Sequence, residues 1–189
     1  MKPQNFAQTN RLTLRQWEDT DRAPFASLCA DPEVMKFFIS SVLDQETACK
    51  RINKWSGLIA ERGWGFWAVE LTENRQFPGF AGLQALDDSH PLGPCVEIGW
   101  RLARKHWGRG YATEAATQVL RFAFGALVLP EVIATTAVGN LRSSAVMERI
   151  GMRGPESVLR FLDVPKESPL GDHVLYRVTS EEWRARGDA

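Results

Sequence analysis

The segment with the clearest chemical potential is a basic loop at residues 103–111, in which Arg109 lies between Gly108 and Gly110. Glycines let backbone N–H groups turn towards a ligand, and the N-terminus of a following helix adds partial positive charge. The loop therefore predicts a site for a phosphate or pyrophosphate group, although such a GxG segment also occurs as an ordinary tight turn. Its spacing matches neither a Walker A loop nor the GxGxxG of dinucleotide-binding folds.

The composition of the whole chain excludes several other classes of site. Lys+Arg and Asp+Glu are both 23 among 189 residues, so the basic excess typical of nucleic-acid binders is absent. The 3 cysteines lie far apart without a CxxC pair, which argues against a disulfide framework and a zinc site. No apolar run of ~18 residues or N-terminal signal segment occurs. We therefore expect a cytoplasmic protein with no metal site and no nucleic-acid or membrane partner.

The elements that must position the loop follow from hydrophobic periodicity and capping residues. Strands are predicted at residues 11–17, 65–71, 79–86, 95–102, 132–137, 157–162 and 173–179. Helices are predicted after the caps Asp19 and Asp21, from Asp44 to about Glu61, from Ala112, after Asn140, and as a terminal turn from Ser180. The order predicts an α+β fold with a mostly antiparallel sheet and helices on both faces. Residues 1–189 are expected to form one domain, with a flexible N-terminus at residues 1–9.

Three segments in this order resemble the GCN5-related N-acetyltransferase (GNAT) superfamily. They are Val96-Glu-Ile-Gly-Trp-Arg-Leu102, Trp107-Gly-Arg-Gly-Tyr-Ala-Thr-Glu-Ala115 and Asn140-Leu-Arg-Ser-Ser-Ala-Val-Met-Glu-Arg-Ile-Gly-Met152. Within that superfamily, the chain is most similar to the branch of ribosomal-protein N-terminal acetyltransferases. The resemblance covers nearly the whole chain, and it implies a GNAT-like sheet that is splayed at its middle strands.

The resemblance implies that acetyl-CoA binds as cosubstrate in that split. The pantetheine arm would pair with backbone near Trp100 and Leu102, and the pyrophosphate would lie on the loop amides. The loop residues implied are Trp107, Gly108, Arg109, Gly110, Tyr111, Ala112 and Thr113. Trp107 stands where the generic family pattern has Gln or Arg, a substitution usual in the suspected branch. Asn140 is implied as a pantetheine contact, while a plain helix N-cap is the alternative.

Acetyl transfer to an amine needs a neutral nucleophile, a donor for the developing oxyanion and a proton for the departing thiolate. Many GNAT proteins carry a tyrosine seven residues past the asparagine, where this chain has Met147. Members of the suspected branch carry a serine three residues past it, here Ser143. Ser143 is therefore the candidate thiolate donor, and a first-turn serine without catalytic role is the alternative.

Glu97 is the acidic residue nearest the expected acetyl site along the chain, which makes it the candidate general base. A structural carboxylate is the alternative, because a bulge in this strand could re-aim the side chain. Asp163, Asp172 and His173 are further candidates for the base. A water relay without a dedicated base also remains open for an α-amine, whose ordinary pKa is ~7.8.

The expected activity is transfer of acetyl from acetyl-CoA to a primary amine, on a protein N-terminus or a small molecule, by direct attack in a ternary complex. A non-catalytic domain that binds or senses acyl-CoA is one alternative, since Met147 cannot donate a proton. An acyltransferase that uses a larger acyl group is another. A homodimer is a family-level expectation.

Overall fold

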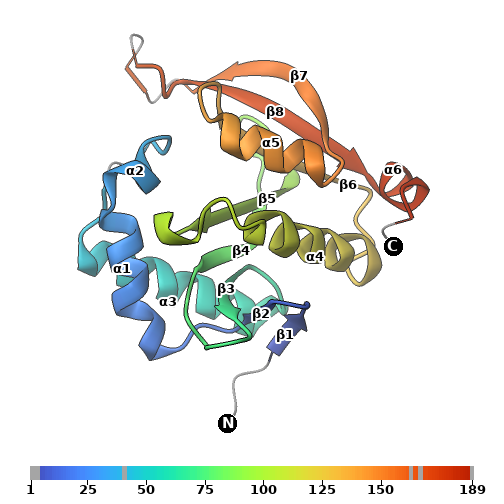
Figure 1. The fold of residues 1–189 in the computed structure, drawn as a ribbon. Helices are drawn as coiled ribbons and strands as arrows, with labels where there is room; N and C mark the ends of the chain where they lie inside the picture. The colour runs from blue at the N-terminus through green and yellow to red at the C-terminus, as the bar shows by residue number, and fades with distance from the viewer. Residues whose placement is uncertain (1–4, 40–41, 162–163, 166–167, 188–189) are drawn as a thin grey trace. The chain divides into compact units, whose positions relative to one another are not determined.

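The computed structural model describes residues 5–39, 42–161, 164–165 and 168–187 (Figure 1). The chain divides into two compact units. Unit 1 comprises Met1–Lys36, Ser40–Leu83 and Gly99–Gln118, and unit 2 comprises Phe37–Ile39, Gln84–Ile98 and Val119–Ala189. Strands β4 and β5 and helix α4 each contribute residues to both units. The single-domain organisation stays a prediction.

The strands of unit 1 follow the order β1-β2-β3-β4-β5. They are β1 (Asn5–Gln8), β2 (Leu12–Arg15), β3 (Phe66–Leu71), the first part of β4 (Gly79–Leu86) and the last part of β5 (Cys95–Leu102). The pairs β1–β2, β2–β3 and β3–β4 are antiparallel, with Leu12 opposite Leu71. Residues 5–8 form β1 on the edge of β2, and the flexible N-terminus expected at residues 1–9 stays a prediction.

Helices η1 (Asp19–Asp21), α1 (Arg22–Ala30), α2 (Pro32–Met35) and α3 (Gln45–Arg62) also belong to unit 1. The Asp44 side chain accepts a hydrogen bond of 2.7 Å from the Thr47 backbone N–H and caps α3. Gly63 ends α3 in the left-handed conformation at φ 83°, which costs glycine little. The predicted boundaries of this helix are confirmed because both signals are local.

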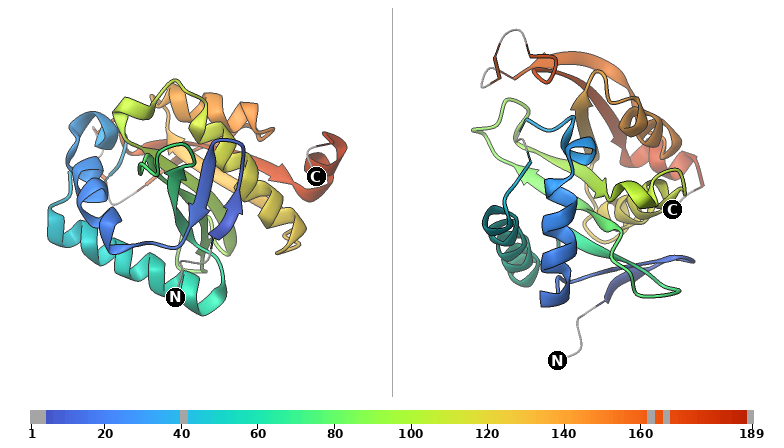
Figure 2. Two further views of the ribbon diagram at one scale, coloured as in Figure 1. Left: turned by 60° about the horizontal axis from the view of Figure 1, so that its bottom comes forward. Right: turned by 60° about the vertical axis from the view of Figure 1, so that its left-hand side comes forward.

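The core of unit 1 is aromatic where α1 and α3 pack against the sheet (Figures 1 and 2). The rings of Trp55 and Phe80 lie 4.7 Å apart, and those of Phe66 and Phe80 5.3 Å. All residues of β3 are buried, so both faces of this strand are covered. Most of the sequence's tryptophans therefore serve packing, as large rings usually do.

Unit 2 has the strand order β4-β5-β6-β8-β7. Strand β6 (Glu131–Ala137) runs parallel to β5, with Glu97 opposite Ile133, and antiparallel to β8 (Asp172–Thr179). Strand β7 (Arg153–Arg160) pairs with β8, so the sheet is mixed but mostly antiparallel. The helices are α5 (Leu141–Arg149), α6 (Ser180–Ala185) and the last part of α4 (Tyr111–Gly125).

Candidate active site

The basic loop runs from the end of β5 to the start of α4 and lies in unit 1. It begins with the 3-10 turn η2 (Arg104–His106). The Trp107 indole N–H donates a hydrogen bond of 2.8 Å to the Leu102 carbonyl. Trp107 thus joins the loop to the last residue of β5 through its indole ring, which Gln and Arg lack.

The backbone of the loop takes the left-handed conformation at two positions, Gly108 with φ 73° and Gly110 with φ 79°. A Cβ on Gly108 would meet no atom within 4 Å, so conformation rather than crowding calls for glycine there. The Glu114 N–H bonds the Gly110 carbonyl at 3.0 Å as α4 begins. The first N–H groups of a helix have no partner within the helix, and they attract anions.

The charge around this loop is positive. Arg104, Lys105 and Arg109 are exposed, whereas His106 is buried. Burial lowers the pKa of His106, and the neighbouring charges of Lys105 and Arg109 lower it further. The imidazole is therefore neutral at pH 7, and the three exposed side chains supply the charge that suits a pyrophosphate.

The end of β5 supplies the other residues expected at the coenzyme. The Arg101 guanidinium is buried and lies 3.7 Å from the Cys29 Sγ in α1. Burial lowers the pKa of Arg101 to about 10, so it stays charged at neutral pH. Because side chains alternate along a strand, Trp100 and Leu102 point to the face of the sheet away from α1.

Residues Tyr111, Ala112 and Thr113 form the first turn of α4, with Tyr111 buried. Unit 1 therefore contains every residue expected at the coenzyme except Asn140. Asn140, Ser143 and Glu97 all belong to unit 2. The joint action of the two groups in one active site stays a prediction.

Asn140 is the N-cap of α5, which was the alternative to a pantetheine contact. Its side-chain oxygen accepts from the Ser143 backbone N–H, and its amide nitrogen donates to Thr136 Oγ1 at 2.9 Å and Ser143 Oγ at 3.0 Å. The Ser143 hydroxyl accepts from Asn140, so its own proton is directed elsewhere. Met147 is buried in the same helix and has no proton to give.

The Glu97 carboxylate accepts a short hydrogen bond of 2.6 Å from the Thr135 hydroxyl of β6. Burial raises the pKa of Glu97, while the bond from Thr135 and the charge of His90 act in the opposite direction. A carboxylate with a raised pKa is a stronger base towards an ammonium group.

The other candidates for the base differ in their surroundings. Asp172 makes an ion pair with Arg160 at 2.9 Å and is therefore already engaged with a cation. His173 is buried with its ring centroid 4.7 Å from that of Phe161, and burial lowers its pKa. Asp163 lies outside the described residues. Glu97 is the candidate whose environment favours proton transfer most.

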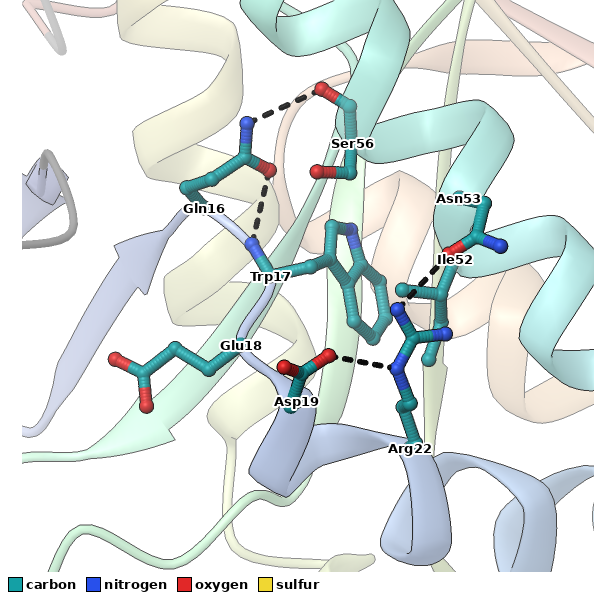
Figure 3. A pocket seen from close by; sticks show the side chains of 8 residues that line it. All are labelled: Gln16, Trp17, Glu18, Asp19, Arg22, Ile52, Asn53 and Ser56. Atoms are coloured by element: carbon teal, nitrogen blue, oxygen red, sulfur yellow. Dashed lines mark hydrogen bonds and ion pairs between the residues drawn. The ribbon is translucent and has the colours of Figure 1, made fainter.

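A separate open pocket of about 520 Å³ lies in unit 1 beside α3 (Figure 3). Figure 3 shows that the Arg22 guanidinium bonds to Asp19 and Asn53 and that the Gln16 amide donates to the Ser56 carbonyl. None of the residues predicted at the site lines it. We assign it no ligand.

Sequence reasoning missed two sets of contacts at the predicted site. Thr9 and Arg11 bind Glu114 across 105 and 103 positions of the chain, and Thr135 binds Glu97 across 38 positions. Hydrophobic periodicity reports on which face of an element is buried, and it carries no signal for such distant polar pairs.

Two further findings concern only the residues that the structure describes. No helix there is long and apolar enough to cross a membrane. No group of three or more His, Cys, Asp or Glu side chains gathers there as a metal site would require.

Known proteins share this architecture. Residues 11–153 match the model of the acetyltransferase (GNAT) domain. The chain is 32% identical over 189 residues to the FsC-acetyl coenzyme A-N(2)-transacetylase of Aspergillus fumigatus, which covers 97% of this chain and 80% of that protein. It is 37% identical over 102 residues to the putative ribosomal N-acetyltransferase YdaF of Bacillus subtilis, covering 54% of this chain and 55% of the relative.

The crystal structure of a GNAT-family acetyltransferase from Bacillus anthracis superposes with a TM-score of 0.79 at 28% identity, covering 92% of this chain and 98% of that one. This likeness confirms the predicted α+β fold, with a central mixed sheet and helices on both faces. The match of the family model over residues 11–153 confirms that the chain is an acetyltransferase. The chain belongs to the GNAT family of acetyltransferases.

Proposed function

We propose that this acetyltransferase moves the acetyl group of acetyl-CoA to a primary amine by direct attack within a ternary complex. The observation that carries the proposal is the loop at residues 107–113. Its left-handed glycines, exposed cations and position at the start of α4 suit a pyrophosphate. The backbone of β5 at Trp100–Leu102 would hold the pantetheine arm, with Asn140 as a further contact.

Two side chains of unit 2 would move the protons. The acceptor nitrogen bonds to the acetyl carbon and the carbon–sulfur bond breaks, which leaves a surplus proton on the nitrogen and a thiolate on the coenzyme. Glu97 takes the surplus proton, so that a neutral amide remains, and Ser143 donates a hydrogen bond or proton to the thiolate. A backbone N–H near Gly99 or Trp100 would stabilise the charge on the carbonyl oxygen.

The acceptor class is the open part of this proposal. One relative is named as an FsC-acetyl coenzyme A-N(2)-transacetylase and another as a putative ribosomal N-acetyltransferase, so the relatives favour no single acceptor class. The surroundings of Glu97 support an amine in either case, because a partly buried carboxylate favours a cationic group beside it.

The test is release of free thiol from acetyl-CoA over a panel of small amines and N-terminal peptides. Activity with at least one amine, and initial-rate patterns that intersect when both substrates are varied, would support direct transfer in a ternary complex. Tight binding of acetyl-CoA without thiol release across the panel would favour the sensing domain instead. Faster thiol release from succinyl-CoA than from acetyl-CoA would identify an enzyme for larger acyl groups.

A further inference from the structure

The turn between β1 and β2 is joined to the start of α4 by several hydrogen bonds within unit 1. The Thr9 hydroxyl donates to Glu114 Oε1 at 2.5 Å, and the Arg11 backbone N–H donates to the same oxygen at 3.0 Å. The Arg11 Nε donates to Glu114 Oε2 at 2.7 Å, and its Nη2 lies 2.6 Å from that oxygen. Both carboxylate oxygens of Glu114 are therefore held by this turn.

The Arg11 guanidinium also contacts the loop at residues 107–113. Its Nη1 donates a hydrogen bond of 2.9 Å to the Arg109 carbonyl, and its carbon lies 4.8 Å from the centre of the Tyr111 ring. One side chain thus contacts the loop, the first residue of α4 and, through Glu114, the first turn of that helix. Arginine suits this position because its planar fork can serve several acceptors at once.

The bond to the Arg109 carbonyl determines which way the next N–H points. In a planar trans peptide the C=O of residue 109 and the N–H of Gly110 point in opposite directions. A carbonyl held towards Arg11 therefore directs the Gly110 N–H away from the Arg11 side chain, and the proposal requires that the pyrophosphate binds on that side. Gly110, the residue that follows the bonded carbonyl, adopts the left-handed conformation with φ 79°.

Glu114 keeps Arg11 in this orientation. Partial burial acts to raise the pKa of Glu114, but the hydrogen bonds from Thr9 and Arg11 outweigh it and hold the pKa below its usual range. The carboxylate is thus ionised at neutral pH. It compensates most of the charge of Arg11, whose side chain is 50% exposed while that of Glu114 is 18% exposed.

We propose that Arg11, anchored by Glu114, is a positioning residue for coenzyme binding that orients the backbone of the loop towards the pyrophosphate. The proposal rests on the proposed function, because it requires that this loop binds acetyl-CoA. It differs from a direct contact between Arg11 and phosphate, in which Glu114 would only weaken the charge available to the ligand.

The experiment compares acetyl-CoA with S-acetyl-pantetheine, a donor that lacks the pyrophosphate. For Arg11→Ala we expect the KM for acetyl-CoA to rise on the order of 10-fold, in line with lost hydrogen bonds to charged groups. The kcat should change little, and kcat/KM for S-acetyl-pantetheine should stay unchanged. A general loss of folding would lower activity with both donors.

Three variants complete the test. Arg11→Lys keeps the charge without the fork, so its KM for acetyl-CoA should lie between those of the parent and Arg11→Ala. Glu114→Gln should weaken acetyl-CoA binding, and the double variant should be no worse than Arg11→Ala, because both changes release the same anchor. Lys50→Ala, which removes an exposed ion pair of 2.7 Å with Glu46 in α3, is the matched control and should leave both KM values unchanged.

The outcomes separate this inference from the function on which it rests. If the parent enzyme does not prefer acetyl-CoA over S-acetyl-pantetheine, the role of the loop in the proposed function is wrong. If the parent shows that preference and Arg11→Ala retains all of it, the positioning role is overturned. Tighter acetyl-CoA binding by Glu114→Gln would also overturn it, in favour of direct contact between Arg11 and phosphate.

Discussion

At the scale of single residues, the proposed proton chemistry depends on Ser143, because the position seven residues past Asn140 is occupied by the buried Met147. The Asn140 amide donates to the Ser143 hydroxyl at 3.0 Å and so leaves the hydroxyl proton for another acceptor. A donor to the leaving thiolate acts chiefly in the transition state.

We therefore expect Ser143→Ala to lower kcat on the order of 10- to 1000-fold, the low end of general-acid effects. The Kd for acetyl-CoA should change little, since the ground state does not use the bond. Steady-state kinetics and direct coenzyme binding measure the two quantities. A raised KM with unchanged kcat would reduce Ser143 to a contact with the coenzyme or a helix-turn serine.

Glu97 supplies a second prediction, which concerns pH. Glu97→Gln keeps the size of the side chain but cannot accept a proton, so it should be slow near pH 7, where the amine is largely protonated. Raising the pH towards 9 deprotonates an α-amine of pKa ~7.8 without help and should restore part of the rate, but a lysine-type amine of pKa ~10.4 far less. Profiles of kcat/KM from pH 6 to 9.5 provide the measurement. Equal rates for parent and variant would make Glu97 a structural carboxylate.

Thr135 gives a third prediction with a defined sign. Its hydroxyl donates to the ionised Glu97 at 2.6 Å and thereby lowers a pKa that burial raises. Thr135→Val removes the donor at nearly constant shape, so the pKa of Glu97 should rise and the acid limb of kcat/KM should move to higher pH. Above that limb the two enzymes should converge, and Thr135→Ser should restore the parent profile. An unmoved acid limb in Thr135→Val would contradict the role of this bond.

At the scale of elements, the loop between β5 and α4 depends on a backbone conformation that only glycine adopts easily. A Cβ at Gly110 would lie 3.3 Å from Arg11 Nη2, and the φ of 79° is unfavourable for a β-branched residue. The loop is exposed, so its distortion should affect the ligand more than the core.

We accordingly expect Gly110→Val to abolish most of the thermal shift that acetyl-CoA causes. For a ligand that binds only the native state, the stabilisation is about 2.7 kcal/mol at a hundred-fold excess over Kd. Thermal unfolding of parent and variant, with and without acetyl-CoA, measures the difference. An identical shift in both proteins would mean that the coenzyme binds elsewhere.

At the scale of the molecule, the described residues include a buried charge cluster that connects distant parts of unit 1. Arg15 of β2 makes bonds of 2.7 and 2.9 Å to Asp21 of η1, and one of 2.9 Å to Glu70 of β3. Burial opposes the charge of Arg15, but the hydrogen bonds that it donates to Asp21 and Glu70 raise its pKa above the ordinary value. The cluster is stable as a unit because each charge has a partner.

Removing one partner of this buried cluster should therefore lower the free energy of unfolding much more than removing an exposed ion pair. Arg15→Met leaves the buried Asp21 without its cation and Glu70 with only Arg75 at 3.3 Å, and we expect it to lower the free energy of unfolding by about 3–5 kcal/mol. Lys50→Ala removes only an exposed i,i+4 pair and should cost about 0.5 kcal/mol or less. Urea unfolding compares the two. A similar small loss in both variants would mean that the cluster is structurally dispensable.

Local signals explain why most elements were predictable. Asp44, Gly63 and Asn140 start or end helices through bonds to neighbours a few residues away, so their positions are visible in the sequence. The strand at residues 5–8 carried no such signal, because an edge strand depends on its partner β2 rather than on its own pattern.

The sequence by itself determined the family, the order of the elements and the loop that suits a pyrophosphate. Each of these depends on spacing within short segments, where capping, periodicity and glycine conformation act over a few residues. Only the tertiary structure decided that Arg11 binds Glu114 and that Thr135 binds Glu97. Such pairs form where distant segments pack, and their distances follow from strand register and helix placement, which no local pattern encodes.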